Sequence, residues 1–183
     1  MIATFTPSRT TMPLPAPTAR VALKSPTGNG LLDGAWWPRS RDLTAELPAL
    51  ADELDPLWGR ITRVAVNPML WPTVPHKVTV HNRVLKVGWF TPELDPHKLL
   101  LLSYGTGRWD LLVIPPETDD ASAARLMSAA CVQDGPPLSA TDLIAAETAR
   151  DLAAGDKPQS AQESWEYEGG AVSTHAVRTD TRR

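Results

Sequence analysis

Apolar and polar residues alternate with a period of two over most of the middle of this 183-residue chain. Such alternation is typical of strands with one buried face. It predicts strands over residues 18–24, 34–37, 61–66, 77–80, 84–90, 98–104 and 108–114. The short connections His81-Asn82-Arg83 and Gly105-Thr106-Gly107 predict hairpins, the second more strongly because glycine adopts positive φ without strain. On the strand at 84–90, Val84, Lys86, Gly88 and Phe90 share the face opposite Leu85, Val87 and Trp89.

A helical period replaces this alternation in three places. Leucines spaced 4, 3 and 4 residues apart fall in one stripe of a helix; they are Leu43, Leu47, Leu50 and Leu54. We expect Asp42 to cap this helix, Pro48 to kink it or to mark its true start, and Pro56 to end it. Helices are also predicted over 120–132, with Asp119 or Asp120 at its start and Gly135 as its stop, and over 140–154. Ser139 and Asp142 resemble a capping box for the last of these helices, and Gly155 is its stop signal.

The order of these elements predicts an α+β fold. Strands joined by short turns favour a curved antiparallel β-meander of about five to seven strands, with two or three helices packed mainly on one face. Four prolines in the first 17 residues predict a disordered N-terminal arm, 1–17. Residues 155–183 contain no Leu, Ile, Met or Phe and predict a disordered tail. A single domain is therefore expected over 18–154.

Composition narrows the classes of function. The chain has 18 Lys+Arg against 21 Asp+Glu, a net charge of −3, which argues against a general nucleic-acid binder. Its one cysteine, Cys131, excludes an intramolecular disulfide and a cysteine-based zinc cluster. No apolar run approaches the ~18 residues of a membrane span, and the first residues lack a signal-peptide core, so we expect a cytoplasmic protein with no membrane partner. The four histidines show no metal-binding spacing, and we expect neither a metal nor a cofactor.

The most unusual segment contains two adjacent tryptophans followed by two arginines. Trp36 and Trp37 must point to opposite faces of a strand, so one indole should be partly exposed near Arg39 and Arg41 unless helices cover both faces. Trp89 and Trp109 are the expected cross-strand neighbours, and together the six residues would form an aromatic groove with arginines at its rim. Such a groove suits a ligand with an apolar ring and an anionic group. In the opposing interpretation the tryptophans are core and the arginines pair with acidic residues, namely Asp33, Asp42 or Asp110.

Three hypotheses for function follow. The first is a non-enzymatic binding or regulatory module whose Trp/Arg surface contacts a protein or a small anionic ligand. The second is a small-ligand-binding protein or enzyme on the concave side of the sheet, using His81, His97 or Asp110. The third is a single-stranded RNA binder that stacks bases on tryptophan; the net charge disfavours it, although local clustering of arginines could support it. No nucleophile motif is present in the sequence, which favours a non-enzyme, and the oligomeric state is left open.

Three segments carry a resemblance to a known family. They are Asp33-Gly-Ala-Trp-Trp-Pro-Arg-Ser40, Val87-Gly-Trp-Phe90 and Arg108-Trp-Asp-Leu-Leu-Val-Ile-Pro-Pro116. Over residues 18–133 the chain resembles an actinobacterial family of small proteins classed as a domain of unknown function. The resemblance implies a cytoplasmic actinobacterial protein, and it implies no activity, cofactor or catalytic residue.

Overall fold

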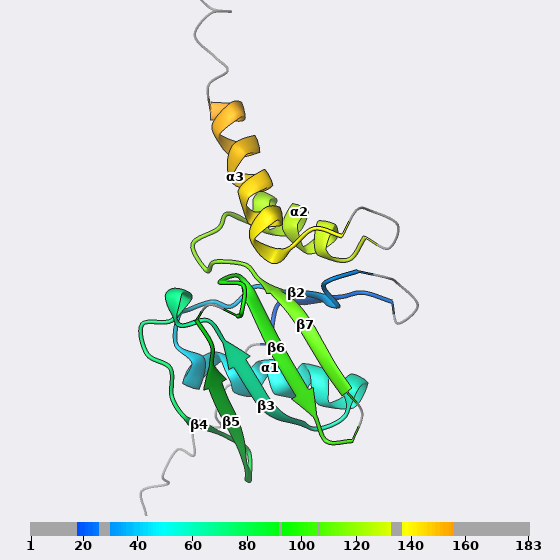
Figure 1. Ribbon diagram of the computed structural model, residues 1–183, viewed down its shortest axis with the longest axis vertical. Helices are drawn as coiled ribbons and strands as arrows, with labels where there is room; N and C mark the ends of the chain where they lie inside the picture. The colour runs from blue at the N-terminus through cyan, green and yellow to red at the C-terminus, as the bar shows by residue number, and fades with distance from the viewer. Residues whose placement is uncertain (1–17, 26–29, 92, 106, 133–136, 156–183) are drawn as a thin grey trace, which may run out of the picture. The chain divides into compact units, whose positions relative to one another are not determined.

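The computed structural model describes residues 18–25, 30–91, 93–105, 107–132 and 137–155. Its strands are β1 (Val21–Leu23), β2 (Gly34–Trp36), β3 (Ile61–Val66), β4 (Lys77–Val80), β5 (Arg83–Trp89), β6 (Lys98–Ser103) and β7 (Gly107–Val113). Its helices are α1 (Leu43–Trp58), the short 3-10 helix η1 (Pro68–Leu70), α2 (Asp120–Ala130) and α3 (Ala140–Gly155). The α+β class is therefore confirmed, and each predicted strand and helix has a counterpart (Figure 1).

The seven strands form one mixed sheet in the order β1-β2-β7-β6-β3-β5-β4. Both predicted hairpins are present: β4 pairs antiparallel with β5, and β6 with β7. One detail of the expected meander differs, because β2 is parallel to β7 and β3 is parallel to β5. The β4–β5 hairpin packs with its second strand inward, beside β3, which leaves β4 at the edge of the sheet.

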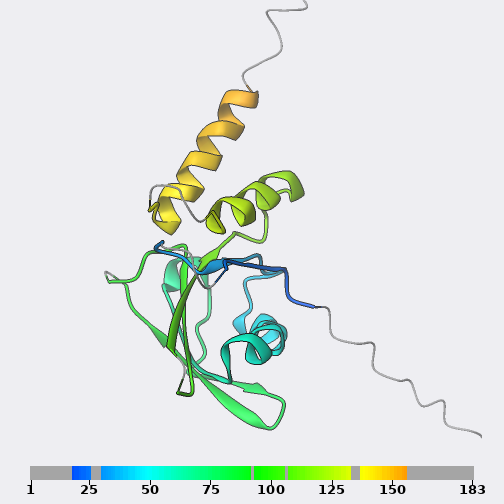
Figure 2. The same cartoon turned by 90° about the vertical axis from the view of Figure 1, so that its right-hand side faces the viewer.

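Two core clusters lie on opposite faces of the sheet. The larger packs α1 against residues of six strands, β2 to β7, among them Val64, Leu85, Leu101 and Leu111. The smaller packs α2 and the first residues of α3 against Ala35, Leu112 and Ile114. Figure 2 shows α1 alone on its side of β3 and β5. Helices thus pack on both faces, a second difference from the expected arrangement, and the part of the sheet at β2 and β7 is covered from both sides.

The predicted leucine stripe forms the buried face of α1, where Leu43, Leu47, Leu50 and Leu54 are each at most 1% exposed. Asp42 caps the helix as predicted, since its side chain accepts a hydrogen bond from the Thr44 amide at 2.8 Å. The helix runs through Pro48 and beyond the expected end at Pro56, reaching Trp58. A proline inside a helix lacks its amide donor and crowds the carbonyl four residues earlier, and burial of the stripe outweighs that cost.

The caps of the other two helices follow the sequence signals. Asp119 accepts hydrogen bonds from the amides of the first turn of α2, and these hydrogen bonds lower the pKa of its carboxyl group. Ser139 and Asp142 exchange hydrogen bonds at the start of α3, which confirms the capping box. Gly135, the predicted stop of α2, lies outside the described residues.

The chain divides into two compact units, residues 1–145 and 146–183. The boundary falls inside α3, so the first unit holds the sheet, α1, α2 and the first residues of α3. The described part of the second unit is the remainder of that helix. The single domain over 18–154 stays a prediction. Of the segments expected to be disordered, 1–17 and 155–183, Gly155 is the last residue of α3 and the rest lies outside the described residues.

Candidate functional site

The two adjacent tryptophans point to opposite faces of β2, as strand geometry requires, and both are buried. Trp36 is 1% exposed and stacks on Trp71 with ring centroids 5.7 Å apart, on the α1 side. Trp37 is 9% exposed and belongs to the core beneath α2, with the Arg20 guanidinium 3.4 Å from its ring centroid. The expectation of an exposed indole is corrected, because helices cover both faces at this strand.

The two arginines that follow bind the protein itself. Arg39 donates from Nη1 to the carbonyl of Thr18 at 2.8 Å. Arg41 donates to the carbonyl of Leu70 at 2.6 Å and forms an ion pair with Glu117 at 2.5 Å. These contacts tie the segment after β2 to the residues before β1, to η1 and to the segment before α2. The acidic partners proposed from the sequence, Asp33, Asp42 and Asp110, are not the ones found among these contacts.

The other two predicted site residues lie elsewhere. Trp109 stacks on Trp58 of α1 with centroids 4.9 Å apart. Trp89, at the end of β5, is 43% exposed and contacts His76. The strand neighbours of Trp36 are Val21 and Val113, and neither is a tryptophan. The structure therefore does not bring the six residues of the Trp/Arg hypothesis into one groove.

The polar groups of the concave-side hypothesis are also separated. His81, at the β4–β5 turn, pairs with Asp52 of α1 at 2.6 Å. Burial lowers the pKa of His97, although Asp95 opposes that shift, and its Nδ1 has no hydrogen-bond partner among the described residues. Asp110 lies on the opposite face of the sheet from α1 and pairs with Lys98 and Arg108. These three groups do not converge on one reaction centre.

A different surface stands out: the face of β3, β5 and β6 that points away from α1. Figure 1 looks onto these strands from this side, with α1 behind them. The core that α2 and α3 build takes no residue from β3, β5 or β6. We call this face, as far as the described residues form it, the open face.

Cations from three adjacent strands stand side by side on the open face. Lys77 of β4 is paired in register with Lys86 of β5, and Lys86 is paired with Arg63 of β3. Residues directly opposite each other in a sheet point to the same side, about 5 Å apart. All three side chains are exposed, and none has a hydrogen-bond or ionic partner among the described residues. The same register continues through Leu102 of β6 to Arg108 of β7. We call the four cations of this line, Lys77, Lys86, Arg63 and Arg108, the basic row; Leu102 of β6 interrupts it between Arg63 and Arg108.

A groove of about 350 Å³ lies beside the basic row. The next register position along the strands holds Gly88 and Ala65, which are paired with each other and form the floor. A Cβ at Gly88 would meet no atom closer than 4.0 Å, so the missing side chain leaves real space. One of the atoms at that distance is Cε2 of Phe90, whose half-exposed ring stands beside the floor. Leu100 and Leu102 line the opposite side.

The carboxylate of Asp110 lies next to Leu100 on the same face and already forms ion pairs with two basic side chains. Lys98 approaches it at 3.8 Å and Arg108 at 3.2 Å. Arg108 is thus partly neutralised, whereas Lys77, Lys86 and Arg63 are not. The open face therefore combines a small apolar groove with three uncompensated positive charges. This arrangement can bind an anion whose attached group is apolar.

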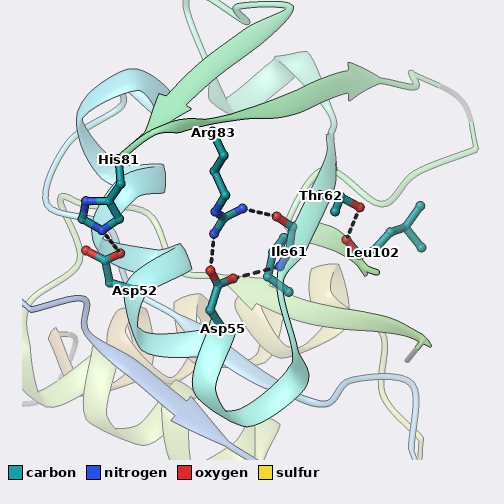
Figure 3. Close-up of polar contacts among 7 residues, drawn as sticks. All are labelled: Asp52, Asp55, Ile61, Thr62, His81, Arg83 and Leu102. Carbon is teal, nitrogen blue, oxygen red and sulfur yellow. Dashed lines mark hydrogen bonds and ion pairs between the residues drawn. The ribbon is translucent and has the colours of Figure 1, made fainter. Parts of the chain in front are cut away.

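A polar network fixes the strands that carry these cations (Figure 3). Asp55, in the last turn of α1, accepts a hydrogen bond from the Ile61 amide at 2.8 Å and forms an ion pair with Arg83. Arg83 also donates to the Ile61 carbonyl. Ile61 and Arg83 begin β3 and β5, so this network holds the two parallel strands at the ends from which Arg63 and Lys86 follow.

Part of this site had a signal in the sequence. The alternation at 84–90 already places Lys86, Gly88 and Phe90 on one face, and the structure confirms it. What the sequence did not supply was the parallel pairing of β3 with β5. That pairing sets Arg63 beside Lys86, and Ala65 beside Gly88.

Comparison with known proteins points to a family. A model described as a family of unknown function, DUF5994, matches residues 20–130. The chain belongs to the DUF5994 family. No curated protein and no solved structure matches the chain. The predicted membership in a domain-of-unknown-function family is therefore confirmed.

The DUF5994 match runs from β1 through the last residue of α2. All of the open face thus lies inside the family segment of this chain. Among the described residues there is no cluster of three or more His, Cys, Asp or Glu that could hold a metal ion. None of the described helices combines the length and the apolar character needed to cross a bilayer.

Proposed function

We propose that this DUF5994 protein is a non-enzymatic binding module that takes an anionic ligand on the open face. The observation that carries the proposal is the run of three exposed cations without partners, Lys77, Lys86 and Arg63, on adjacent strands. The ligand's charged group would lie on these cations and its apolar part in the groove beside them.

The arrangement of these cations has no benefit for folding. Like charges directly opposite each other in a sheet are destabilising, whereas opposite charges contribute roughly 0.2–1 kcal/mol per pair. Lys86 has a cation on both sides, so a carboxylate at this position would make the sheet more stable. A bound anion would supply the missing negative charge, and this gives the arrangement a functional reason.

The groove adds selectivity for the ligand's uncharged part. Its floor is made by the two smallest residues of the face, Gly88 and Ala65, and its walls by Phe90, Leu100 and Leu102. The exposed ring of Phe90 offers an aromatic face to a planar group. Phosphate or carboxylate attached to a ring therefore fits better than either part alone.

Titration of the full chain with pyrophosphate and with adenosine monophosphate tests the proposal. In amide NMR spectra we expect shifts of residues 63, 65, 86 and 88, and binding that weakens as salt is added. Arg63→Ala and Lys86→Ala should each weaken binding, while Arg150→Ala, which removes an exposed arginine of α3, should not. Absence of binding by both anions, or equal loss in the control, would overturn the proposal.

The cellular setting belongs to the same proposal. A single cysteine gives no internal disulfide, which agrees with a reducing compartment such as the cytoplasm. The sequence resemblance supports an actinobacterial source. Expression of the tagged chain in such a bacterium, followed by fractionation, would test the location directly.

A further inference from the structure

We infer that the anionic ligand is a single-stranded nucleic acid, which crosses the strands with its phosphates on the basic row and a base in the groove. This inference rests on the proposed function and names its ligand class. It is carried by three features of the open face: the length of the row, its open end at β4, and the position of Phe90.

The basic row is too long for one small anion. It runs over five neighbouring strands, from Lys77 of β4 to Arg108 of β7. Neighbouring strands lie about 4.8 Å apart, so the four steps cover roughly 19 Å. A single phosphate or pyrophosphate reaches only two adjacent cations at this spacing. A polymer with a phosphate in every repeat reaches the whole row.

The basic row is also exposed to solvent, whereas a site for a small molecule would enclose most of its ligand. Pockets for small ligands bury 70–90% or more of the ligand. Here Lys77 lies on β4, the last strand of the sheet, so the row runs out to the edge. The groove of about 350 Å³ holds one ring and opens to solvent beside the row. Such a surface suits a chain that continues past the edge of the sheet.

The ring of Phe90 favours a single strand over a duplex. It is 53% exposed and stands at the edge of the groove floor formed by Gly88 and Ala65. A base can stack on this ring only if it is not already stacked and paired within a helix. Stacking of a base on an aromatic side chain contributes about 1–3 kcal/mol and tolerates every base. Binding with little sequence preference is therefore expected.

The net charge of −3 does not oppose this inference, because binding depends on the local field. Lys77, Lys86 and Arg63 have no carboxylate partner among the described residues, and the one acidic side chain of the neighbouring register, Asp110, is paired. Three phosphate contacts on a single strand predict a slope of log affinity against log salt of roughly −2.

The test is fluorescence anisotropy of the full chain with labelled oligouridylates of 1, 2, 4, 8 and 12 nucleotides, and with a duplex RNA. We expect the affinity to rise with oligonucleotide length to at least about four nucleotides. The affinity for the duplex should be lower than that for a single strand of equal length. Arg63→Ala and Lys86→Ala should each weaken binding and reduce the salt slope by about 0.7. Phe90→Ala should weaken it by roughly tenfold with the slope unchanged.

Matched variants separate binding from folding. Lys86→Arg keeps the charge and should keep the affinity. Gly88→Val should block the groove, and the space around its Cβ lets the variant fold. Arg150→Ala, on α3, should change nothing. Melting curves verify that every variant is folded before its affinity is interpreted.

The outcomes decide between the two proposals. If pyrophosphate and adenosine monophosphate bind through Arg63 and Lys86 but longer oligonucleotides bind no more tightly, the nucleic-acid inference is overturned and the anion-binding module stands. If the duplex binds as well as the single strand, or an aspartate- and glutamate-rich peptide binds where oligonucleotides do not, the inference is also overturned. If none of these anions binds, both proposals are overturned.

Discussion

Replacing Lys86 by glutamate should make the protein more stable while it weakens anion binding. Lys86 stands between Lys77 and Arg63 in the register of the sheet. At present both of its lateral neighbours repel it. A carboxylate at the same position would attract both, on an exposed face where no core packing changes. The prediction thus separates a role in binding from a role in folding.

Two charge pairs, Lys77 with residue 86 and Arg63 with residue 86, change from repulsive to attractive in Lys86→Glu. They set the size of the expected gain in the free energy of unfolding. An opposite-charge pair across neighbouring strands contributes roughly 0.2–1 kcal/mol, and a like-charge pair is unfavourable. We therefore expect Lys86→Glu to raise the free energy of unfolding by about 1 kcal/mol. In a domain of this size that corresponds to a rise in melting temperature of about 2–4 °C.

The assay is urea denaturation of the wild type, Lys86→Glu and Lys86→Gln at low salt and at about 1 M salt, where exposed charges are screened over about 3 Å. Lys86→Gln only removes the repulsion, so its stability should fall between the other two. The differences should shrink at high salt. The reasoning is refuted if Lys86→Glu is no more stable than Lys86→Gln at low salt, since the three cations would then not be neighbours.

Three other predictions concern the fold that supports the site. Leu50→Ala should cost roughly 2–5 kcal/mol in urea denaturation, because the side chain is 1% exposed on the buried face of α1; a change within about 0.5 kcal/mol would contradict the packing. Arg83→Leu should cost roughly 1–3 kcal/mol, and its combination with Asp55→Asn should cost less than the sum, since both break one network. The pKa of His97 lies below its ordinary 6.5, chiefly through burial, so the unfolded chain takes up a proton first as the pH falls through 6.5. Stability should decrease from pH 7.5 to 5.5 in the wild type, and by less in His97→Phe.

The helices and their caps could be predicted from the sequence because their determinants are local. The leucine stripe needs only the spacing of four residues, and the caps at Asp42, Asp119 and Ser139 need only the residues of the first turn. The two hairpins are local in the same sense. Where a local rule failed, at Pro48 and Pro56, burial of the stripe of α1 overrode it.

The pairing of strands that are far apart in the chain could not be predicted in this way. Alternation fixes which residues share a face of one strand, but not which strand lies beside it. A meander was the simplest order, and it missed the parallel neighbours β3 and β5. The candidate site depends on that pairing, since Arg63 and Lys86 are 23 positions apart in sequence.

The expected exposed tryptophan is absent because helices cover both faces of β2, and not because the strand geometry was wrong. Trp36 and Trp37 do point to opposite faces, but α1 covers one and α2 covers the other. The sequence contains the signals for both helices, yet no local pattern states which face a helix will cover. Arg41 could equally have been exposed; its contact with Leu70 depends on η1, for which no periodic signal was present.

The net charge says little about any single face of the protein, because it averages over residues with different tasks. Many of the acidic side chains in this chain serve the fold. They cap helices or pair with basic groups and amides at element ends, as do Asp42, Asp52, Asp55, Glu117, Asp119 and Asp142. Their partners are amides, hydroxyls and basic groups at element ends, and Lys77, Lys86 and Arg63 are not among them. Lys77, Lys86 and Arg63 have no such partner among the described residues. A chain can thus be acidic overall and still present a surface that is locally positive, and it is this local excess that an approaching anion meets.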